Sequence, residues 1–200
     1  MKKLLPLLLV FLLFSSCYRV LLLTMEVKSP KIETHQSLTK HLDKYHLNSE
    51  QIYAAKDSIS RMNLWANGFP EAVIFNKDGF FVDYREEPES CNAGIDAFIE
   101  YLPNNQDIEI DQKYHADSLL QQIVLLNDMT SVPFDNSYDY TIVLTWVKFA
   151  GKVIPQHFKP WEESIQIAET NGLKIRRVYL NLDFMDYMGY EGDPEVTVER

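Results

Sequence analysis

The chain has 200 residues, of which 46% are apolar and 24% are charged, values typical of one globular domain with short appendages. Its formal net charge of −10 argues against nucleic acid and anionic lipid as main partners, because both bind clustered basic surfaces. We therefore expect no nucleic-acid partner, and we interpret the acidity as a means of staying soluble.

The N-terminal stretch MKKLLPLLLVFLLFSSCYRV starts with positive charge and continues as an apolar run. Lys2 and Lys3 precede the run Leu4–Phe14, and two serines stand directly before Cys17. This pattern resembles a bacterial lipoprotein signal peptide with its lipobox, here FSSC, although Phe14 stands where Leu is commonest. The resemblance implies cleavage after residue 16 and attachment of acyl chains such as palmitate to Cys17, and two or three chains suffice for stable anchoring.

Two other interpretations of this stretch remain open, an uncleaved membrane anchor and a core helix. Leu4–Thr24 approaches the roughly 20 residues that a membrane span needs, but Arg19 lies inside it. Under the lipoprotein interpretation, residues 1–16 are the signal peptide, residues 17–33 are a lipidated tether, and the net charge of the mature chain becomes −12. Tyr18 stands where Asp would favour the inner membrane, so we expect an outer-membrane anchor that faces the periplasm.

The segment that follows predicts two helices and a short strand. The apolar stretch Val20–Val27 is either part of the tether or an edge strand. Thr34 is a suitable N-cap for a helix with an apolar stripe. A short strand is expected over Gln51–Lys56, and Asp57 caps a second helix that ends near Trp65.

A β-hairpin is the clearest local pattern in the chain. Two strand-like runs, Ala72–Phe75 and Phe80–Tyr84, are joined by Asn76–Gly79, whose Asp-Gly pair supplies the positive φ angles of a tight turn. Pro70 stands immediately before the hairpin. The later predicted elements are helix 92–101, a polar linker 104–111, helix 114–127, loop 128–139, strand 140–148, helix 156–171, strand 173–183 and a tail that folds back on the domain.

Two stretches together resemble the thioredoxin fold. YTIVLTWVKFAGKVIPQHFKPWEESIQIAETNGLKIRRVYLNLD resembles its strand–helix–strand core. GFPEAVIFNKDGFFVDY resembles its later part, where a proline, here Pro70, precedes a hairpin and a helix. The two halves occur in swapped order. The resemblance implies a single α/β domain over residues 34–190, with a mixed sheet of about four to five strands and helices on both faces, followed by a tail over residues 191–200.

The redox cysteine pair of thioredoxin-like proteins is absent. Ala150 and Val153 occupy the two positions, and Lys152 stands where Pro is usual. Thiol–disulfide exchange needs an attacking thiolate and a resolving partner, so that chemistry does not carry over. The sequence thus favours binding over catalysis.

The groove that the resemblance implies would hold an extended polypeptide by strand-edge pairing, which would make the protein a binding or scaffolding lipoprotein. Its expected residues are Pro70, Trp146, Ala150, Gly151 and Lys152.

Cys91 supports an alternative function. It is the one cysteine besides Cys17, so the mature domain has no second thiol for an internal disulfide. A low thiol pKa at a helix N-terminus would make the chain an envelope thiol redox protein that acts through Cys91 alone. A partly buried structural cysteine is the competing interpretation, and three nearby glutamates would raise its pKa.

No metal or cofactor site is expected. The histidines lack the i, i+4 pairing of zinc motifs, and phosphate-binding and dinucleotide motifs are absent. His157 lies near the expected helix start and is a candidate neutral acceptor. Asp183 and Asp186 follow the last strand, where they are either solvated or capping acids or, alternatively, a cation site. The histidines are His35, His41, His46, His115 and His157.

Overall fold

The computed structural model describes residues 22–66, 68–85, 94–104, 110–192 and 194. The expected signal peptide, Cys17 and Cys91 lie outside these residues, as does the start of the helix expected at residue 92.

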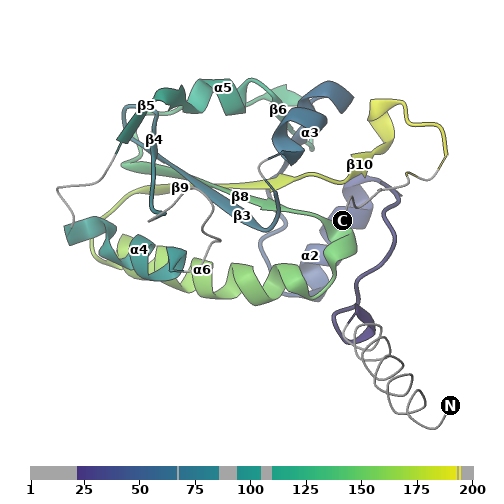
Figure 1. Cartoon of the computed structure of the whole chain (residues 1–200), viewed down its shortest axis with the longest axis horizontal. Helices are drawn as coiled ribbons and strands as arrows, with labels where there is room; N and C mark the ends of the chain where they lie inside the picture. The colour runs from purple at the N-terminus through teal and green to yellow at the C-terminus, as the bar shows by residue number, and fades with distance from the viewer. Residues whose placement is uncertain (1–21, 67, 86–93, 105–109, 193, 195–200) are drawn as a thin grey trace, which may run out of the picture.

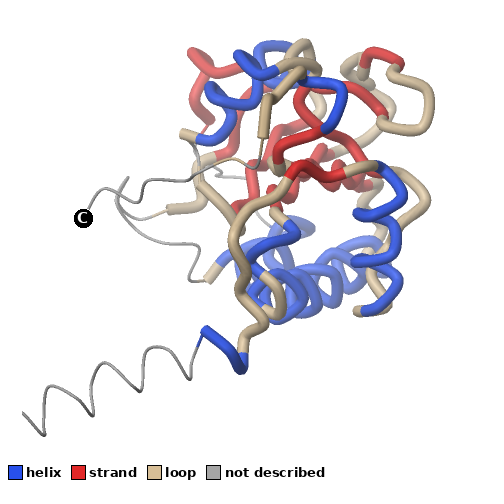
Figure 2. The backbone as a smooth tube through the Cα atoms, turned by 90° about the vertical axis from the view of Figure 1, so that its right-hand side faces the viewer, coloured by secondary structure: helices blue, strands red, loops and turns tan. Residues whose placement is uncertain are grey.

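Helices cover both faces of a central mixed sheet, which confirms the expected α/β class. Helices α4 (Ile95–Tyr101) and α6 (Val153–Thr170) lie on one face, and α3 (Ser58–Trp65) and α5 (Ala116–Leu120) lie on the other (Figure 1). The view turned by 90° shows the strands between two helical layers (Figure 2).

The main sheet of the described chain has eight strands in the order β5-β4-β3-β8-β9-β2-β6-β7. Its strands are β2 (Ile52–Ala55), β3 (Glu71–Asn76), β4 (Phe80–Val82), β5 (Ile110–His115), β6 (Ile123–Leu125), β7 (Thr130–Ser131), β8 (Tyr140–Trp146) and β9 (Ile175–Asn181). β8, β9 and β2 are mutually parallel, and the other pairings are antiparallel. The carboxyl ends of the three parallel strands therefore meet at one edge of the sheet.

The core centres on β8 and β9. Every residue of β8 after Tyr140 is buried, as its run of β-branched and apolar residues predicts. Helix α6 packs its buried face, which includes Phe158 and Ile165, against this centre and against α4. The expected hairpin, the strand at Gln51–Lys56 and the helices capped by Thr34 and Asp57 are confirmed.

The two ends of the described chain meet in a second, small sheet. β1 (Ile32–Glu33) pairs in parallel with β10 (Phe184–Met185), and the 3₁₀ turn η3 (Asp186–Met188) follows β10. The Tyr187 hydroxyl donates a hydrogen bond to the Ala55 carbonyl, at 2.6 Å. The expectation that the tail folds back on the domain is thus confirmed over these residues.

Several sequence expectations are wrong. β5 begins at Ile110, inside the expected linker 104–111, and β7 (Thr130–Ser131) lies inside the expected loop 128–139. Of the two alternatives for Val20–Val27, the edge strand is not formed over the described residues 22–27, where residues 22–24 are helical, residues 25 and 26 form a turn and residue 27 is in a loop. The helix expected at 114–127 is instead the end of β5, the short α5 and β6. β6 pairs with the free edge of β2, placing Ala55 opposite Ile123, and this pairing overrides the local helical pattern. These extra strands raise the sheet from the expected four to five to eight.

Candidate functional site

The turn after β8 lies beside the Pro70 segment. β8 ends at Trp146, and the short 3₁₀ helix η2 (Lys148–Ala150) leads into α6. The Phe69–Pro70 peptide bond is cis, and Glu71 pairs with Thr145 at the end of β8. The Phe69 and Phe149 ring centroids are 5.6 Å apart. The two halves of the proposed resemblance therefore meet at this end of the sheet.

The chain's own N-terminal segment, Met25–Lys28, covers the turn. The Lys28 amide donates to the Phe149 carbonyl at 2.9 Å, and the Lys152 amide donates to the Met25 carbonyl at 2.7 Å. Gly151, with φ +59°, leaves room for this approach: a Cβ there would lie 2.4 Å from the Met25 carbonyl oxygen. The backbone of the turn that was expected to bind a polypeptide partner is thus covered by Met25–Lys28, which belong to the expected tether.

The residues expected to line a groove divide between core and surface. Trp146 is fully buried and Ala150 is 6% exposed, so both are core residues. Lys152 lies at the surface, where its Nζ atom pairs with Glu26 at 3.0 Å. Gly151 is the member of the set that lines an open cavity.

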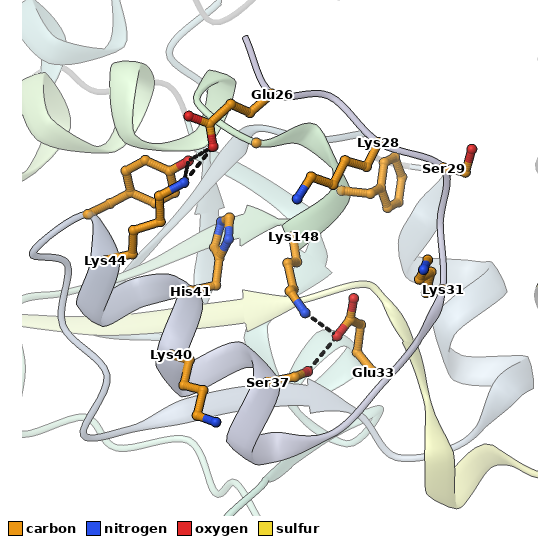
Figure 3. Close-up of a pocket in the computed structure, with 13 residues that line it drawn as sticks. Glu26, Lys28, Ser29, Lys31, Glu33, Ser37, Lys40, His41, Lys44 and Lys148 are labelled. Atoms are coloured by element: carbon orange, nitrogen blue, oxygen red, sulfur yellow. Dashed lines mark hydrogen bonds and ion pairs between the residues drawn. The ribbon is translucent and has the colours of Figure 1, made fainter. Parts of the chain in front are cut away.

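That cavity, called the lysine pocket below, lies between the N-terminal segment, helix α2 (His35–Lys44) and η2. Its volume is about 440 Å³. Figure 3 shows Lys28 and Lys148 extending into the space that these elements enclose. The lining residues are Glu26, Lys28, Ser29, Lys31, Glu33, Ser37, Lys40, His41, Lys44, Tyr45, Lys148, Phe149 and Gly151.

Positive charge dominates the lysine pocket, because five lysines and two glutamates line it. Glu26 pairs with Lys44 and Lys152, and these hydrogen bonds, that of Lys44 foremost, lower the pKa of Glu26 to about 2. Glu33 pairs with Lys148. The remaining lysines of the lining, Lys28, Lys31 and Lys40, have no carboxylate partner among the described residues.

His41 forms part of the pocket's inner wall. Its ring stacks on Trp146, with centroids 6.0 Å apart and planes within 9°, and it meets Tyr45 edge-on. Burial, followed by the charges of Lys148 and Lys44, lowers the pKa of His41 to about 4, so the imidazole is neutral at pH 7. Its Nε2 atom is buried and has no hydrogen-bond partner within the described chain.

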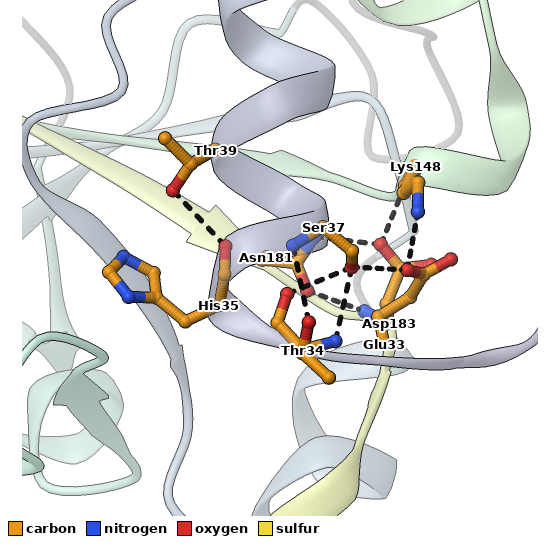
Figure 4. A network of polar contacts seen from close by, with 8 residues as sticks. All are labelled: Glu33, Thr34, His35, Ser37, Thr39, Lys148, Asn181 and Asp183. Carbon is orange, nitrogen blue, oxygen red and sulfur yellow. Dashed lines mark hydrogen bonds and ion pairs between the residues drawn. The ribbon is translucent and has the colours of Figure 1, made fainter.

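A buried polar network supports the pocket at the carboxyl ends of β8 and β9 (Figure 4). Glu33 accepts from Ser37 Oγ and from Lys148 Nζ. The Lys148 backbone amide donates to Asp183 Oδ2 at 2.6 Å, and Asn181 Nδ2 donates to the same oxygen at 2.8 Å. The network fixes the backbone of η2, and through Glu33 it holds the Lys148 ammonium group at the pocket.

Asp183 is a buried capping residue, not a solvated acid. It is 1% exposed, and burial raises the pKa of its carboxyl group to about 6. Asp186 is exposed at the start of η3. Within the described ranges, no group of three or more histidine, cysteine or acidic side chains is arranged to hold a metal ion.

His157 does not reach the pocket. It lies in the first turns of α6, where its Nδ1 atom is 2.9 Å from the Val153 carbonyl oxygen and its ring meets Trp161. Cys91, the expected alternative site, is outside the described residues.

The lysine pocket was not predicted from the sequence, although the spacing of its lysines is a signal that could have indicated it. Lys40 and Lys44 are one helical turn apart, with His41 between them, and Lys28 and Lys31 stand three residues apart. Lys28 and Lys31 belong to the expected tether, and Lys40 and Lys44 belong to an expected helix. No sequence pattern indicates that these two segments lie side by side in the folded chain.

The fold and the pocket together define a domain with a basic cavity at the carboxyl edge of its parallel strands, a usual place for ligand sites in α/β proteins. Comparisons with protein-family models, with curated proteins and with solved structures found no match to this chain. Within the part of the chain described, no helix is both long and apolar enough to cross a bilayer.

Proposed function

We propose that the chain is a lipid-anchored binding protein of the bacterial cell envelope, held in the outer membrane by acyl chains on Cys17 and facing the periplasm. The support is the N-terminal pattern: two lysines, an apolar run and the FSSC lipobox directly before Cys17. The mature domain has a pocket but no paired thiols, so its role is to hold a ligand.

We further propose that the domain is thioredoxin-like with its two halves in rearranged order. Three features support this kinship. The sheet contains the run β4-β3-β8-β9, in which β8 and β9 are parallel and β3 is antiparallel to β8. Helix α6, which joins β8 to β9, packs against α4, which follows the hairpin. Pro70 directly precedes β3 beside the turn into α6.

The lysine pocket is the observation that carries the binding role. It opens next to the turn at which thioredoxin-like proteins act, and its wall includes Gly151 of that turn. Ala150 and Val153 offer no sulfur at the redox positions. An extended polypeptide would have to displace Met25–Lys28 from the turn, so the open pocket is the better candidate for the binding site.

Two measurements on the full chain test this proposal. Metabolic labelling with palmitate should mark the wild type and Cys91→Ser, but not Cys17→Ser. Reduction of a model disulfide by the purified chain should stay at the background rate in both the wild type and Cys91→Ser.

Two results would contradict the proposal. Palmitate labelling that survives Cys17→Ser would refute the anchor. Disulfide reduction above background that Cys91→Ser abolishes would replace the binding role with the thiol function.

A further inference from the structure

We propose that the lysine pocket is a binding site for a phosphoryl group, carried either by a soluble phosphate compound or by the headgroup of an anionic lipid. The inference rests on the binding role proposed above and specifies its ligand.

The lysine pocket is basic although the whole chain is acidic. The whole chain has a formal net charge of −10, yet the lining of this pocket, with His41 neutral, adds up to +3. Charges of one sign that line a concave surface focus the electrostatic potential and attract the opposite charge. A basic pocket on an acidic protein therefore attracts a compact anion, whereas the rest of the surface repels one.

The lysines of the pocket differ in whether they pair with a carboxylate among the described residues. Lys148 is fixed by Glu33, and its backbone is held in turn by the buried Asp183. Lys28 and Lys31 come from the N-terminal segment and Lys40 from α2, and within the described residues none of these three has a carboxylate partner. Unpaired ammonium groups on two walls of one cavity leave hydrogen-bond donors free for a ligand that bridges the walls.

His41 adds a group of a different kind to the wall of the pocket. Its buried Nε2 atom has no partner among the described residues, an unusual state for a buried polar atom in a native protein. A neutral imidazole can donate one N–H, and a bound anion would also favour its protonated form. Burial, followed by the charges of Lys148 and Lys44, lowers the pKa of His41 to about 4, and an anion beside the ring would raise it.

A phosphoryl group fits these features better than a single carboxylate does. A phosphomonoester carries up to two negative charges and a lipid phosphodiester carries one, and both present at least two acceptor oxygens that can bind ammonium groups from two walls at once; lysine is a common point-charge partner of phosphate. The volume of about 440 Å³ falls within the ~300–1,000 Å³ of small-molecule sites, which leaves space for the remainder of a phosphorylated ligand.

The pocket lies close in the chain to the expected lipid anchor at Cys17. Eight residues separate Cys17 from Glu26 of the pocket wall, and a chain of that length spans at most about 30 Å. With Cys17 lipidated, the pocket stays within that reach of the bilayer, where phosphoryl headgroups are concentrated.

The test measures anion binding by the full chain in neutral detergent, with inorganic phosphate as probe and acetate as the singly charged comparison. The readouts are calorimetric affinity and the NMR titration of His41. We expect phosphate to bind more tightly than acetate and to raise the pKa of His41. Since a hydrogen bond to a charged group is worth about tenfold or more in affinity, the variant Lys28→Gln/Lys31→Gln should weaken phosphate binding at least about tenfold.

The matched control is Lys77→Gln/Lys113→Gln, which removes the same charge from exposed lysines outside the pocket. It should leave phosphate affinity within about twofold of wild type. Circular dichroism establishes that both variants are folded, as expected for substitutions at exposed positions.

A second arm distinguishes the sources of the phosphoryl group. The full chain is reconstituted in phosphatidylcholine vesicles with or without phosphatidylglycerol. A rise in the pKa of His41 that needs phosphatidylglycerol, and that Lys28→Gln/Lys31→Gln removes, supports the lipid headgroup. Binding of free phosphate in detergent supports a soluble ligand.

The proposal is overturned if neither arm shows binding, if acetate binds as well as phosphate, or if the pocket variant binds as the control does. Failure of palmitate labelling would refute the anchor but leave the detergent arm intact, so the two proposals fail separately.

Discussion

Gly151 decides how closely the N-terminal segment approaches the turn after β8. Its φ of +59° and the 2.4 Å that would separate an added Cβ from the Met25 carbonyl oxygen both oppose a side chain. Gly172 makes an informative comparison, because its φ of +101° is also positive but an added Cβ would meet nothing within 4 Å.

We predict that Gly151→Ala loosens the N-terminal segment and destabilises the domain. The unfavourable φ alone costs about 1–3 kcal/mol, and the clash with Met25 adds to it unless the segment detaches. Urea unfolding should show a larger loss for Gly151→Ala than for Gly172→Ala. Amide exchange at Lys28 and Lys152 should speed up in Gly151→Ala alone, and equal exchange in the two variants would contradict the clash.

Asp183 makes stability depend on pH in a defined direction. Its pKa is about 6 in the folded chain, against an ordinary 3.8. The folded state therefore binds the Asp183 proton more tightly than the unfolded state does. The resulting contribution to the free energy of unfolding is complete below pH 3.8 and is lost as the pH rises through about 6. Asn at this position cannot ionise, and its amide oxygen can still accept from Lys148 N.

We expect Asp183→Asn to gain stability relative to wild type as the pH rises from 4 to 7, by at most about 3 kcal/mol. Urea unfolding of both chains across this range measures the difference. His41 acts in the opposite direction over a similar range, since its lowered pKa removes stability as the pH falls, but it is common to both chains and cancels. A difference that does not change with pH would show that Asp183 titrates normally.

Helix α2 carries one wall of the pocket, and its start is set by a reciprocal cap. Thr34 Oγ1 accepts from the Ser37 amide at 3.2 Å, and Ser37 Oγ accepts from the Thr34 amide at 3.1 Å. Ser37 Oγ also donates to Glu33, so the cap is joined to the polar network beneath the pocket.

Thr34→Ala should therefore cost about 1 kcal/mol of stability, as loss of an N-cap usually does. Thr34→Ser keeps the hydroxyl and should cost much less. Thermal unfolding of the two variants gives the comparison. An equal loss in both would mean that the methyl group of Thr34, and not its hydrogen bond, stabilises the helix start.

Local patterns predicted those elements whose environment agrees with the sequence. The hairpin of β3 and β4, the caps at Thr34 and Asp57 and the buried β8 all carry their own residue-level cues. β6 does not, because Ile123 and Leu126 fit a helical stripe as well as a strand. Its conformation is decided by the free edge of β2, which is far away in the sequence.

The lysine pocket could not be predicted for a related reason. Its walls come from residues 26–31, from α2 and from η2, which are joined by contacts between residues far apart in the sequence, such as the hydrogen bond from the Lys28 amide to the Phe149 carbonyl and the ion pair of Glu33 with Lys148. The turn after β8 was predicted as a site from resemblance, but the covering of that turn by Met25–Lys28 has no sequence signature.

At the scale of the whole molecule, net charge and local charge point in opposite directions. The composition argues against an anionic partner, whereas Glu26 and Glu33 are the only acidic residues in the described lining of the pocket. Glu26 pairs with both Lys44 and Lys152, so its removal would leave two ammonium groups without this partner and raise the local charge by one unit.

We predict that Glu26→Gln raises the phosphate affinity of the full chain about two- to fivefold, since one unit of charge at a surface distance is worth about 0.5–1 kcal/mol. Glu163→Gln makes the same change in net charge at an exposed position on α6, away from the lysine pocket, and should have little effect. Calorimetry in low and high salt provides the measurement, and the gain should shrink in high salt because surface charges are screened. Equal gains in both variants would mean that the overall acidity of the protein, and not the pocket, controls its encounter with anions.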